Sequence, residues 1–452
     1  MNIADQYMRV ETCYTGEIDN YGYAFVPGSA KGVVLLDKRT KNLLDNLSSF
    51  HSGKDEQRLQ LLLQNGLIRY CDTPPRSPAL NKATIKSMST WLHITNSCNL
   101  DCGYCYIVGK KDKQPMPLSV VKSYLDKLEN TIRVHQLESV QIRIAGGEPT
   151  MQKKLVAYLA EEVRARFIEK GVRIQLILLT NGTLLNPWWI QLIKSHFMKL
   201  CISLDGMEEW HDLQRFFKNG LGSFGKVHQN INLCLEKGIK PNILTTITEN
   251  NISGISQLGK YLIDSNLPFR LGVYRDNSGN FDGYESFIEK VLDALNDCYN
   301  YYACAIRERR ATFNHQLADI HLNKRPHLRS CNIGYSGVTV DHTGNVFLCQ
   351  AGMDRKPIGN LRDQSTLLQM AWSQETLPEL REKNVLNYRN CHTCQWALAC
   401  GGGCPIVNAS VNGAADIASP YCKLIKTMIP RLIELKALQF IQKYVTLKNE
   451  RR

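Results

Sequence analysis

The sequence predicts an α/β protein, a parallel sheet or barrel preceded by a small domain and followed by a cysteine-rich one. From Ser89 onward, strand-like apolar segments alternate with amphipathic helical segments over about 200 residues, and parallel strands need such crossover helices. After about residue 310 the alternation stops, and Cys and Gly become dense. The Cys, Gly and polar motifs follow the predicted strands, at the carboxyl ends where such folds build active sites.

The first domain is predicted to be a winged-helix-like unit over residues 1–75. Its pattern is a strand-like segment, two short stretches with apolar residues at helical spacing, a glycine stop and a second strand-like segment. These elements are residues 32–36, 43–50, 59–63, 66 and 67–68. A stretch rich in Pro and polar residues follows, and we expect residues 76–88 to be a linker.

The barrel is predicted to span residues 89–310. Short apolar runs bounded by polar loops indicate buried strands, and recurring apolar residues at helical spacing indicate the helices between them. The expected strands are residues 91–95, 140–145, 173–179, 199–204, 243–247 and 270–274, and the expected helices are residues 118–132, 152–170, 187–197, 224–237 and 252–265.

The cysteine-rich domain is predicted to span residues 311–425. Residues 338–341 and 346–349, joined by a His-Thr-Gly-Asn turn, predict a β-hairpin. Beyond it, periodic apolar residues are too few for a large core, so metal–thiolate bonds are the candidate for what holds the domain. Residues 426–452 are predicted to form a basic C-terminal helix exposed to solvent.

Composition excludes several classes of protein. An apolar fraction of 43% excludes wholesale disorder, and neither a long apolar run nor a secretory signal is found. We expect a cytoplasmic protein, whose 16 Cys are metal ligands or buried thiols rather than disulfides. The excess of 55 Lys+Arg over 42 Asp+Glu suits nucleic acid, an acidic peptide or an anionic cofactor, but charge alone does not report chemistry.

The sharpest motif is a C-x3-C-x2-C run formed by Cys98, Cys102 and Cys105, directly after the first barrel strand. Three closely spaced thiolates can bind three irons of a [4Fe-4S] cluster and leave the fourth iron without a protein ligand. Zinc is the alternative. It requires a fourth ligand, and no His or Cys lies within ten residues after Cys105.

With Tyr104 before its last Cys, this loop resembles the signature of the radical S-adenosylmethionine (SAM) enzymes. Further motifs follow in that family's order. They are Gly146-Gly147-Glu148-Pro149 after the second strand, Thr180-Asn181-Gly182 after the third, and Ser203-Leu204-Asp205-Gly206 with His211-Asp212 and Arg215 after the fourth. The resemblance covers about residues 89–275 and implies a partial (β/α)6, TIM-like barrel.

The resemblance also implies that SAM chelates the open iron, and that one electron from the cluster cleaves SAM to a 5′-deoxyadenosyl radical that takes a hydrogen atom from the substrate. Gly146 and Gly147 would let the backbone approach the methionyl amine, Glu148 would accept its ammonium, and Arg215 would pair with its carboxylate. For Thr180, Asn181 and Ser203, capping of strands or helices is the structural alternative. The residues expected to bind SAM are Tyr104, Gly146, Gly147, Glu148, Thr180, Asn181, Ser203, Asp205 and Arg215.

The cysteine-rich domain carries a second constellation, spaced C-x12-G-x4-C and then C-x2-C-x5-C-x3-C-x17-C. It consists of Cys331, Cys349, Cys391, Cys394, Cys400, Cys404 and Cys422. This pattern is similar to the SPASM extension of radical SAM enzymes, which implies two auxiliary [4Fe-4S] clusters and three clusters in all. A zinc module is the alternative, although only five residues separate Cys394 from Cys400, which is short for a zinc ribbon.

The resemblance further implies interleaved ligation. One set, Cys391, Cys394, Cys400 and Cys422, would hold the distal cluster, and a second set, Cys331, Cys349 and Cys404, the cluster nearer the barrel. The fourth iron of the second cluster would be open to substrate or bound by Cys304, Cys298 or another residue. The isolated Cys13, Cys71, Cys201 and Cys234 are expected to be buried bystanders.

Members of this family modify peptides or proteins, so we expect a maturase of a ribosomally made peptide that forms an intrapeptide carbon–carbon or carbon–sulfur crosslink. The alternatives are an anaerobic sulfatase maturase and a peptide epimerase. Sulfatase maturases carry an Asp directly after the Cys that corresponds to Cys349, where this chain has Gln350. From another class, a zinc-stabilised basic protein that binds nucleic acid would explain the charge but not the ordered motifs.

The resemblance implies two protein partners. The N-terminal unit resembles domains that add a leader-peptide strand to a sheet edge, and an external donor such as a flavodoxin or ferredoxin would supply the electron. Neither a membrane nor nucleic acid is expected as a partner. No catalytic residue is assigned; Asp341, His342 and Gln350 lie near the predicted hairpin as candidates for a general base.

Overall fold

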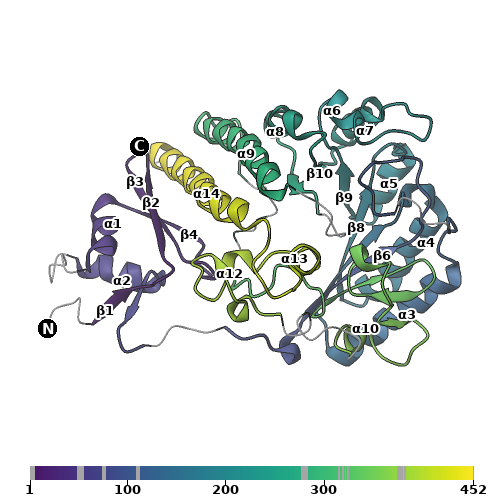
Figure 1. Ribbon diagram of the computed structural model, residues 1–452, viewed down its shortest axis with the longest axis horizontal. Coiled ribbons are helices and arrows are strands. Elements are labelled where there is room, and N and C mark those ends of the chain that lie inside the picture. Colours follow the sequence, from purple (N-terminus) through teal and green to yellow (C-terminus); the bar gives the residue numbers. More distant parts are fainter. Residues whose placement is uncertain are drawn as a thin grey trace.

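The computed structural model places a small N-terminal region at one end of the molecule and the barrel at the other, with two long helices between them (Figure 1). The described residues are 6–47, 55–73, 78–107, 112–275, 283–313, 316–317, 320, 322, 325–373, 380 and 383–450. No helix within these ranges is both long and apolar enough to cross a membrane. Residues 76 and 77 of the predicted linker lie outside the described residues.

Six parallel strands form the centre of one sheet and lie side by side in chain order. They are β6 (Ser87–His93), β7 (Ser139–Ala145), β8 (Arg173–Thr180), β9 (Lys199–Ser203), β10 (Asn242–Ile247) and β11 (Phe269–Val273). The α/β class and the partial barrel predicted from the sequence are confirmed. Strand β6 begins within the predicted linker, because Met88 packs into the core.

Amphipathic helices connect these strands, as predicted. Helix α3 shows the reason, since its residues Val121, Tyr124, Leu125 and Leu128 form one buried stripe. The connecting helices are α3 (Leu118–His135), α4 (Lys153–Val163), α5 (Pro187–Ser195), α6 (Glu209–Asp212), α7 (Phe224–Glu236) and α8 (Ile255–Asp264). These connections place the loops after β6, β7, β8 and β9 at the same end of the sheet, the end formed by the carboxyl ends of its parallel strands.

The cysteine-rich region extends the barrel sheet. Strand β13 (Gly337–Val340) pairs in parallel with β6, and the antiparallel strands β14 (Asn345–Phe347) and β15 (Gly359–Asn360) follow, so the predicted hairpin is present. At the opposite edge, β12 (Gln316–Leu317) pairs with β11. The described residues of this region also form the short helices α10 (Leu367–Ala371), α12 (Ala397–Cys400) and α13 (Pro405–Asn412).

The N-terminal region contains more strands than the sequence predicted. The predicted strand and two helices are present as β4 (Val33–Leu36), α1 (Lys38–Asp45) and α2 (Glu56–Gln64). The second predicted strand is present as β5 (Ile68–Tyr70), which pairs with β1 (Tyr7–Arg9). In addition, β2 (Tyr14–Ile18) and β3 (Tyr21–Phe25) form an antiparallel sheet with β4. Phe50, at the end of the first predicted helix, lies outside the described residues. The winged-helix interpretation stays a prediction.

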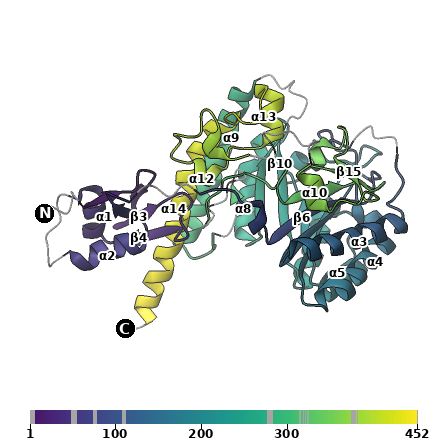
Figure 2. The same ribbon diagram turned by 90° about the horizontal axis from the view of Figure 1, so that it is seen from below.

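The prediction of a solvent-exposed C-terminal helix is wrong. Helix α14 (Cys422–Glu450) begins before the predicted boundary and buries an apolar stripe that includes Met428, Leu432 and Leu438. Both views place it between the N-terminal region and helix α9 (Tyr284–Arg307) (Figures 1 and 2). Basic residues occur between the buried apolar residues along the helix. The net charge of the segment does not show this arrangement, which is why the sequence suggested an exposed helix.

Candidate active site and thiol clusters

The three thiols of the Cys98 loop lie at the carboxyl end of β6. Backbone N–H of Leu100 donates to Cys98 Sγ at 3.4 Å, Asn181 Nδ2 lies 3.8 Å from the same sulfur, and Arg215 Nη1 lies 3.8 Å from Cys102 Sγ. Burial raises the pKa of Cys98 and raises that of Cys102 to about 11, and the nearby Cys105 adds to both increases. Thiols that interact in this way, with donors aimed at two sulfurs, fit the ligand set of an iron–sulfur cluster.

Gly146 and Gly147 pack directly against the start of the cysteine loop. Gly147 N donates to Thr95 O, and Glu148 N donates to Ser97 O, each at 2.7 Å. A Cβ on Gly146 would lie 2.5 Å from Thr95 O, and one on Gly147 would lie 2.2 Å from Ser97 O. The glycines are therefore required by contact between two loops of the protein, a reason that differs from the predicted approach to the cofactor.

Glu148 is completely buried and already has several partners. Its Oε1 accepts from Thr150 N at 2.9 Å and from Thr180 Oγ1 at 2.7 Å, and its Oε2 accepts from Asn181 N at 2.7 Å. Burial raises the pKa of Glu148 despite these hydrogen bonds. In this structure the carboxylate joins the loops after β7 and β8; its predicted contact with the methionyl ammonium stays a prediction.

Asn181 continues this bracing toward the cysteine loop. Its side-chain nitrogen donates to Asn99 Oδ1 at 2.9 Å, and its side-chain oxygen accepts from Thr183 N at 3.0 Å. Thr180 Oγ1 also accepts from Gly182 N at 3.0 Å, which is the capping role considered as an alternative. Ser203, the last residue of β9, is partly exposed at the same edge of the sheet.

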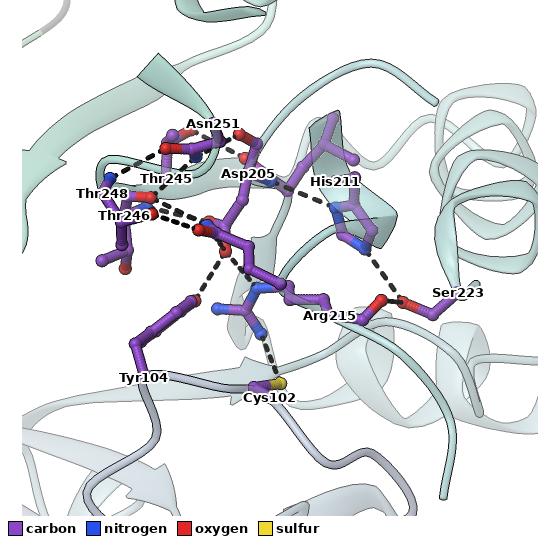
Figure 3. Close-up of polar contacts among 12 residues, drawn as sticks. Cys102, Tyr104, Asp205, His211, Arg215, Ser223, Thr245, Thr246, Thr248 and Asn251 are labelled. Carbon is purple, nitrogen blue, oxygen red and sulfur yellow. Dashed lines mark hydrogen bonds and ion pairs between the residues drawn. The ribbon is translucent and has the colours of Figure 1, made fainter. Parts of the chain in front are cut away.

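Asp205 is the centre of the densest polar network at this edge (Figure 3). Its Oδ2 accepts from Tyr104 OH at 2.6 Å, from Gln214 Nε2 at 2.8 Å and from Arg215 Nε at 2.5 Å. Its Oδ1 accepts from Thr246 N at 2.8 Å. Burial alone would raise the pKa of Asp205, but the Arg215 guanidinium leads the favourable charges and hydrogen bonds that hold this pKa below its usual value.

Arg215 is positioned by the Asp205 network rather than standing free for a ligand. Its guanidinium is paired with Asp205, lies 5.3 Å from the centre of the Tyr104 ring and points toward Cys102 Sγ (Figure 3). Burial opposes its charge, but Asp205 raises the pKa of Arg215, so the cation is retained. The predicted partners of SAM, Tyr104, Asp205 and Arg215, are thus brought together as one unit.

His211 supports this unit from behind. Asp205 N donates to His211 Nδ1 at 3.2 Å, and His211 Nε2 lies 2.9 Å from Ser223 Oγ, which donates to Arg215 O. This arrangement assigns a neutral ring with its proton on Nε2. Burial lowers the pKa of His211 to about 4, against the attraction of Asp205.

The seven C-terminal cysteines separate into the two sets that the resemblance implied. The distal set lines one small pocket. Burial, and to a smaller extent the neighbouring thiols Cys400, Cys422 and Cys394, raise the pKa of Cys391 to about 11. The second set lines a different cavity of about 590 Å³, where burial, Cys404 and Cys331 raise the pKa of Cys349 to about 12. Cys400 also lines this larger cavity.

Three consecutive glycines lie in the chain between Cys400 of the distal set and Cys404 of the second set. Gly401, Gly402 and Gly403 have φ of 69°, 84° and 75°, which favours glycine, and a Cβ on Gly401 would lie 2.5 Å from Ser330 N.

Among the described residues, no group of three or more His, Cys, Asp or Glu is close enough to hold a single metal ion.

The remaining cysteines lie apart from these sets. Cys298 is buried in α9 and donates to Ile255 O at 3.6 Å, and Cys304 is exposed on the same helix. Cys13, Cys201 and Cys234 are buried as expected, whereas Cys71 is exposed.

Of the candidates for a general base, Asp341 accepts from Thr343 N and Asn345 N and holds the hairpin turn, while His342 Nε2 lies 2.8 Å from Asp112 Oδ2. Gln350 lines the larger cavity.

Sequence reasoning missed two buried cations beside the C-terminal thiols. Lys383 Nζ donates to Ser330 Oγ at 2.8 Å and to Gly403 O at 2.9 Å, and Arg329 donates to Lys383 O at 3.0 Å. Burial lowers the pKa of both groups, while Cys331 raises it. Lys383 lies in a stretch without periodicity, so no sequence pattern indicated it. Gln214 was also missed, although it is next to Arg215.

Comparison with known proteins identifies two regions. Residues 92–257 match the radical SAM superfamily, and residues 331–395 match SPASM, an iron-sulfur cluster-binding domain.

The relatives in sequence include a cysteine-type anaerobic sulfatase-maturating enzyme of Clostridium perfringens, 25% identical over 75% of this chain and 96% of its own length. A serine-type anaerobic sulfatase-maturating enzyme of Bacteroides thetaiotaomicron is 26% identical over 68% of this chain and 80% of its own length.

Solved structures share the fold. A histidine-tagged form of the protein anSMEcpe with bound AdoMet has a TM-score of 0.63 at 21% identity, covering 79% of this chain and 99% of its own. SuiB of Streptococcus suis bound to the precursor peptide SuiA has a TM-score of 0.55 at 16% identity, covering 91% of this chain and 98% of its own. Together with the motif loops assembled at one edge of the sheet, the two matched regions establish that the chain is a radical SAM enzyme with a SPASM domain, a class that uses SAM and [4Fe-4S] clusters.

Proposed function

We propose that this enzyme is a maturase of a ribosomally synthesised peptide and forms an intrapeptide carbon–carbon or carbon–sulfur crosslink. The observation that carries the proposal is the N-terminal region. The likeness to SuiB, whose structure contains a precursor peptide, covers 91% of this chain, whereas the likeness to anSMEcpe covers 79%. We infer that the additional coverage includes this region, which would hold a leader peptide at a sheet edge.

Three clusters are part of the proposal. Cys98, Cys102 and Cys105 would hold the first, the distal set the second, and Cys331, Cys349 and Cys404 the third. When bound, SAM and the first cluster supply a 5′-deoxyadenosyl radical that abstracts a hydrogen atom from the substrate. Closing the crosslink would then remove one electron and one proton from the substrate radical. Cys331, Cys349 and Cys404 line the larger cavity, where a cluster that accepts this electron would lie close to the substrate.

This chain's own residues orient and shield that chemistry. Asp205 holds Arg215 and Tyr104 in one buried network, and Arg215 directs a charged donor toward Cys102 Sγ. Glu148 and Asn181 tie the neighbouring loops to the cysteine loop. These buried and mutually hydrogen-bonded residues would exclude water from the site. Water in the site would otherwise quench the radical.

Sulfatase maturation is the second candidate, favoured by the relatives in sequence from Clostridium perfringens and Bacteroides thetaiotaomicron. Against it stands Gln350, which follows Cys349 and lines the larger cavity. An amide cannot accept the proton that a carboxylate at this position would take. Under either candidate function, an external donor such as a flavodoxin or ferredoxin would supply the electron that reduces the first cluster.

The test is anaerobic co-expression of this protein with a short precursor peptide encoded beside its gene, followed by mass spectrometry. We expect the peptide to lose the mass of two hydrogen atoms and to resist fragmentation between the two joined residues. An unchanged mass would indicate epimerisation. A sulfatase peptide provides the comparison: an aldehyde formed on its Cys or Ser, with no change in the precursor peptide, would contradict the crosslinking proposal.

A further inference from the structure

Several arginines, from the barrel and from the cysteine-rich region, line the larger cavity. It lies between the barrel strands and the cysteine-rich region and measures about 590 Å³, within the range of small-ligand sites. Among the described residues that line it there is no Asp or Glu, whereas Arg143, Arg270, Arg275, Arg329 and His327 are present.

Two of these arginines belong with the thiols. Arg329 is buried and donates to the carbonyl oxygens of Lys383 and Leu380, and the Cys331 thiol raises its pKa against the larger, opposing effect of burial. The Arg275 charge lowers the pKa of Cys349, against the larger effect of burial. Both cations therefore offset charge at the second thiol set.

Arg143 and Arg270 have a different environment. Arg143 is on β7 and Arg270 is on β11, and β8, β9 and β10 lie between these strands in the sheet. Because the sheet curves, residues of these two strands line the same cavity. Burial lowers the pKa of Arg143, the Cys201 thiol opposes this, and Arg270 lowers it further. The hydrogen bond of Arg143 to Gln141 Oε1, at 3.0 Å, brings no negative charge.

We propose that Arg143 and Arg270 bind a carboxylate of the peptide substrate within this cavity. The inference rests on the proposed function, which supplies the peptide. Guanidinium groups match a carboxylate through paired N–H donors. Trp91, the register partner of Arg143 on β6, adds an aromatic wall. Cys331, Cys349 and Cys404 line the same cavity, so the carboxylate fixes the substrate beside the second thiol set.

Three blocked amino acids test the proposal by calorimetric titration of the reconstituted protein in a carboxylate-free buffer. Acetyl-glutamate N-methylamide represents an acidic side chain, acetyl-glutamine with a free carboxylate represents a peptide C-terminus, and acetyl-glutamine N-methylamide is the neutral control. We expect one of the two carboxylate probes to bind at least about tenfold more tightly than the neutral control, and the tighter one identifies the source of the carboxylate.

Variants assign the binding to the two residues. Arg143→Gln and Arg270→Gln should each reduce that preference at least about tenfold, as expected for loss of a charge-assisted pair. Arg173→Gln is the matched control, because Arg173 is an exposed residue of β8 paired with Glu138 outside the cavity. This variant should retain the full preference. Thermal unfolding checks that each variant is folded.

Equal binding of all three probes, or a preference that survives both Gln variants, would overturn the proposal. If the Gln variants do not fold, Arg143→Lys and Arg270→Lys decide. Loss of the planar fork should weaken binding several-fold, and unchanged affinity would count against the proposal. The titration does not depend on turnover. A protein that crosslinks its peptide but shows no carboxylate preference would lose this inference and keep its proposed function.

Discussion

At Asp205, one fully buried carboxylate accepts hydrogen bonds from three side chains and one backbone N–H. An unpaired charge in such a place would cost several kcal/mol, so the carboxylate and the Arg215 guanidinium depend on each other. The same pair fixes the donor that faces Cys102 Sγ. At the residue scale, the stability of the network and the geometry of the cysteine loop are therefore linked.

His211 makes this link sensitive to pH. Burial lowers its pKa to about 4, with Arg215 lowering and Asp205 raising it, from an unfolded value of about 6.5. Between these values the unfolded chain binds more protons than the folded one, so the stabilisation is complete above pH of about 6.5 and is lost as the pH falls toward 4. We expect this loss to be roughly 3 kcal/mol in the free energy of unfolding.

Chemical denaturation of the wild type and of His211→Gln, at several pH values in this window, measures the effect. The variant should lack this part of the pH dependence. The difference in the free energy of unfolding between the wild type and the variant should therefore become smaller as the pH falls. Acid lability of the clusters affects both proteins and cancels in the comparison. Parallel curves across the whole window would show that the ring is not held neutral.

At the scale of elements, Gly147 sets the distance between the turn after β7 and the cysteine loop. Gly147→Ala would place a Cβ 2.2 Å from Ser97 O, next to Cys98. The loop has to shift, at a cost of about 1–3 kcal/mol, and the three thiols lose their common geometry. We expect a lower melting temperature and less iron in the first cluster, measured by iron analysis and electron paramagnetic resonance.

Gly103→Ala is the matched control for Gly147→Ala. Gly103 lies within the cysteine loop itself, between Cys102 and Cys105, but a Cβ there has no neighbour within 4 Å. Iron content close to that of the wild type is expected. If both variants lose iron equally, the loop is sensitive to any change and the argument from close packing does not hold.

How far the sequence predicts these elements depends on the range of the signal. The parallel strands were found because each is a local apolar run. The hairpin of β2 and β3 was missed, although Asp19 and Asn20 form its turn with φ of 48° and 71°, a recognisable turn signal. The motifs identified which residues gather at the site. The partners of Glu148 could not be predicted, because Thr180 and Asn181 reach it only when β7 and β8 pair.

At the scale of the whole molecule, α14 joins the N-terminal region to the barrel. Tyr23 of β3 donates to Glu434 Oε1 at 3.3 Å, and Tyr299 of α9 donates to Glu434 Oε2. Tyr23, Phe25 and Val33 belong to the same continuous core as Leu432 and the barrel strands. The N-terminal region is therefore packed into the molecule, and removing residues 1–75 would expose apolar surface as well as remove the proposed peptide-binding element.

Leu432→Ala tests whether α14 couples the two ends. Leu432 is 1% exposed, and its truncation should cost about 2–5 kcal/mol because a cavity remains in a shared core. We expect hydrogen exchange to accelerate together in β3 and in α9, and the melting temperature to fall. Leu213→Ala, at a residue 55% exposed, is the control and should change neither quantity. Faster exchange in α9 alone would mean that the N-terminal region is stabilised independently, since a helix that couples two elements transmits its loss to both.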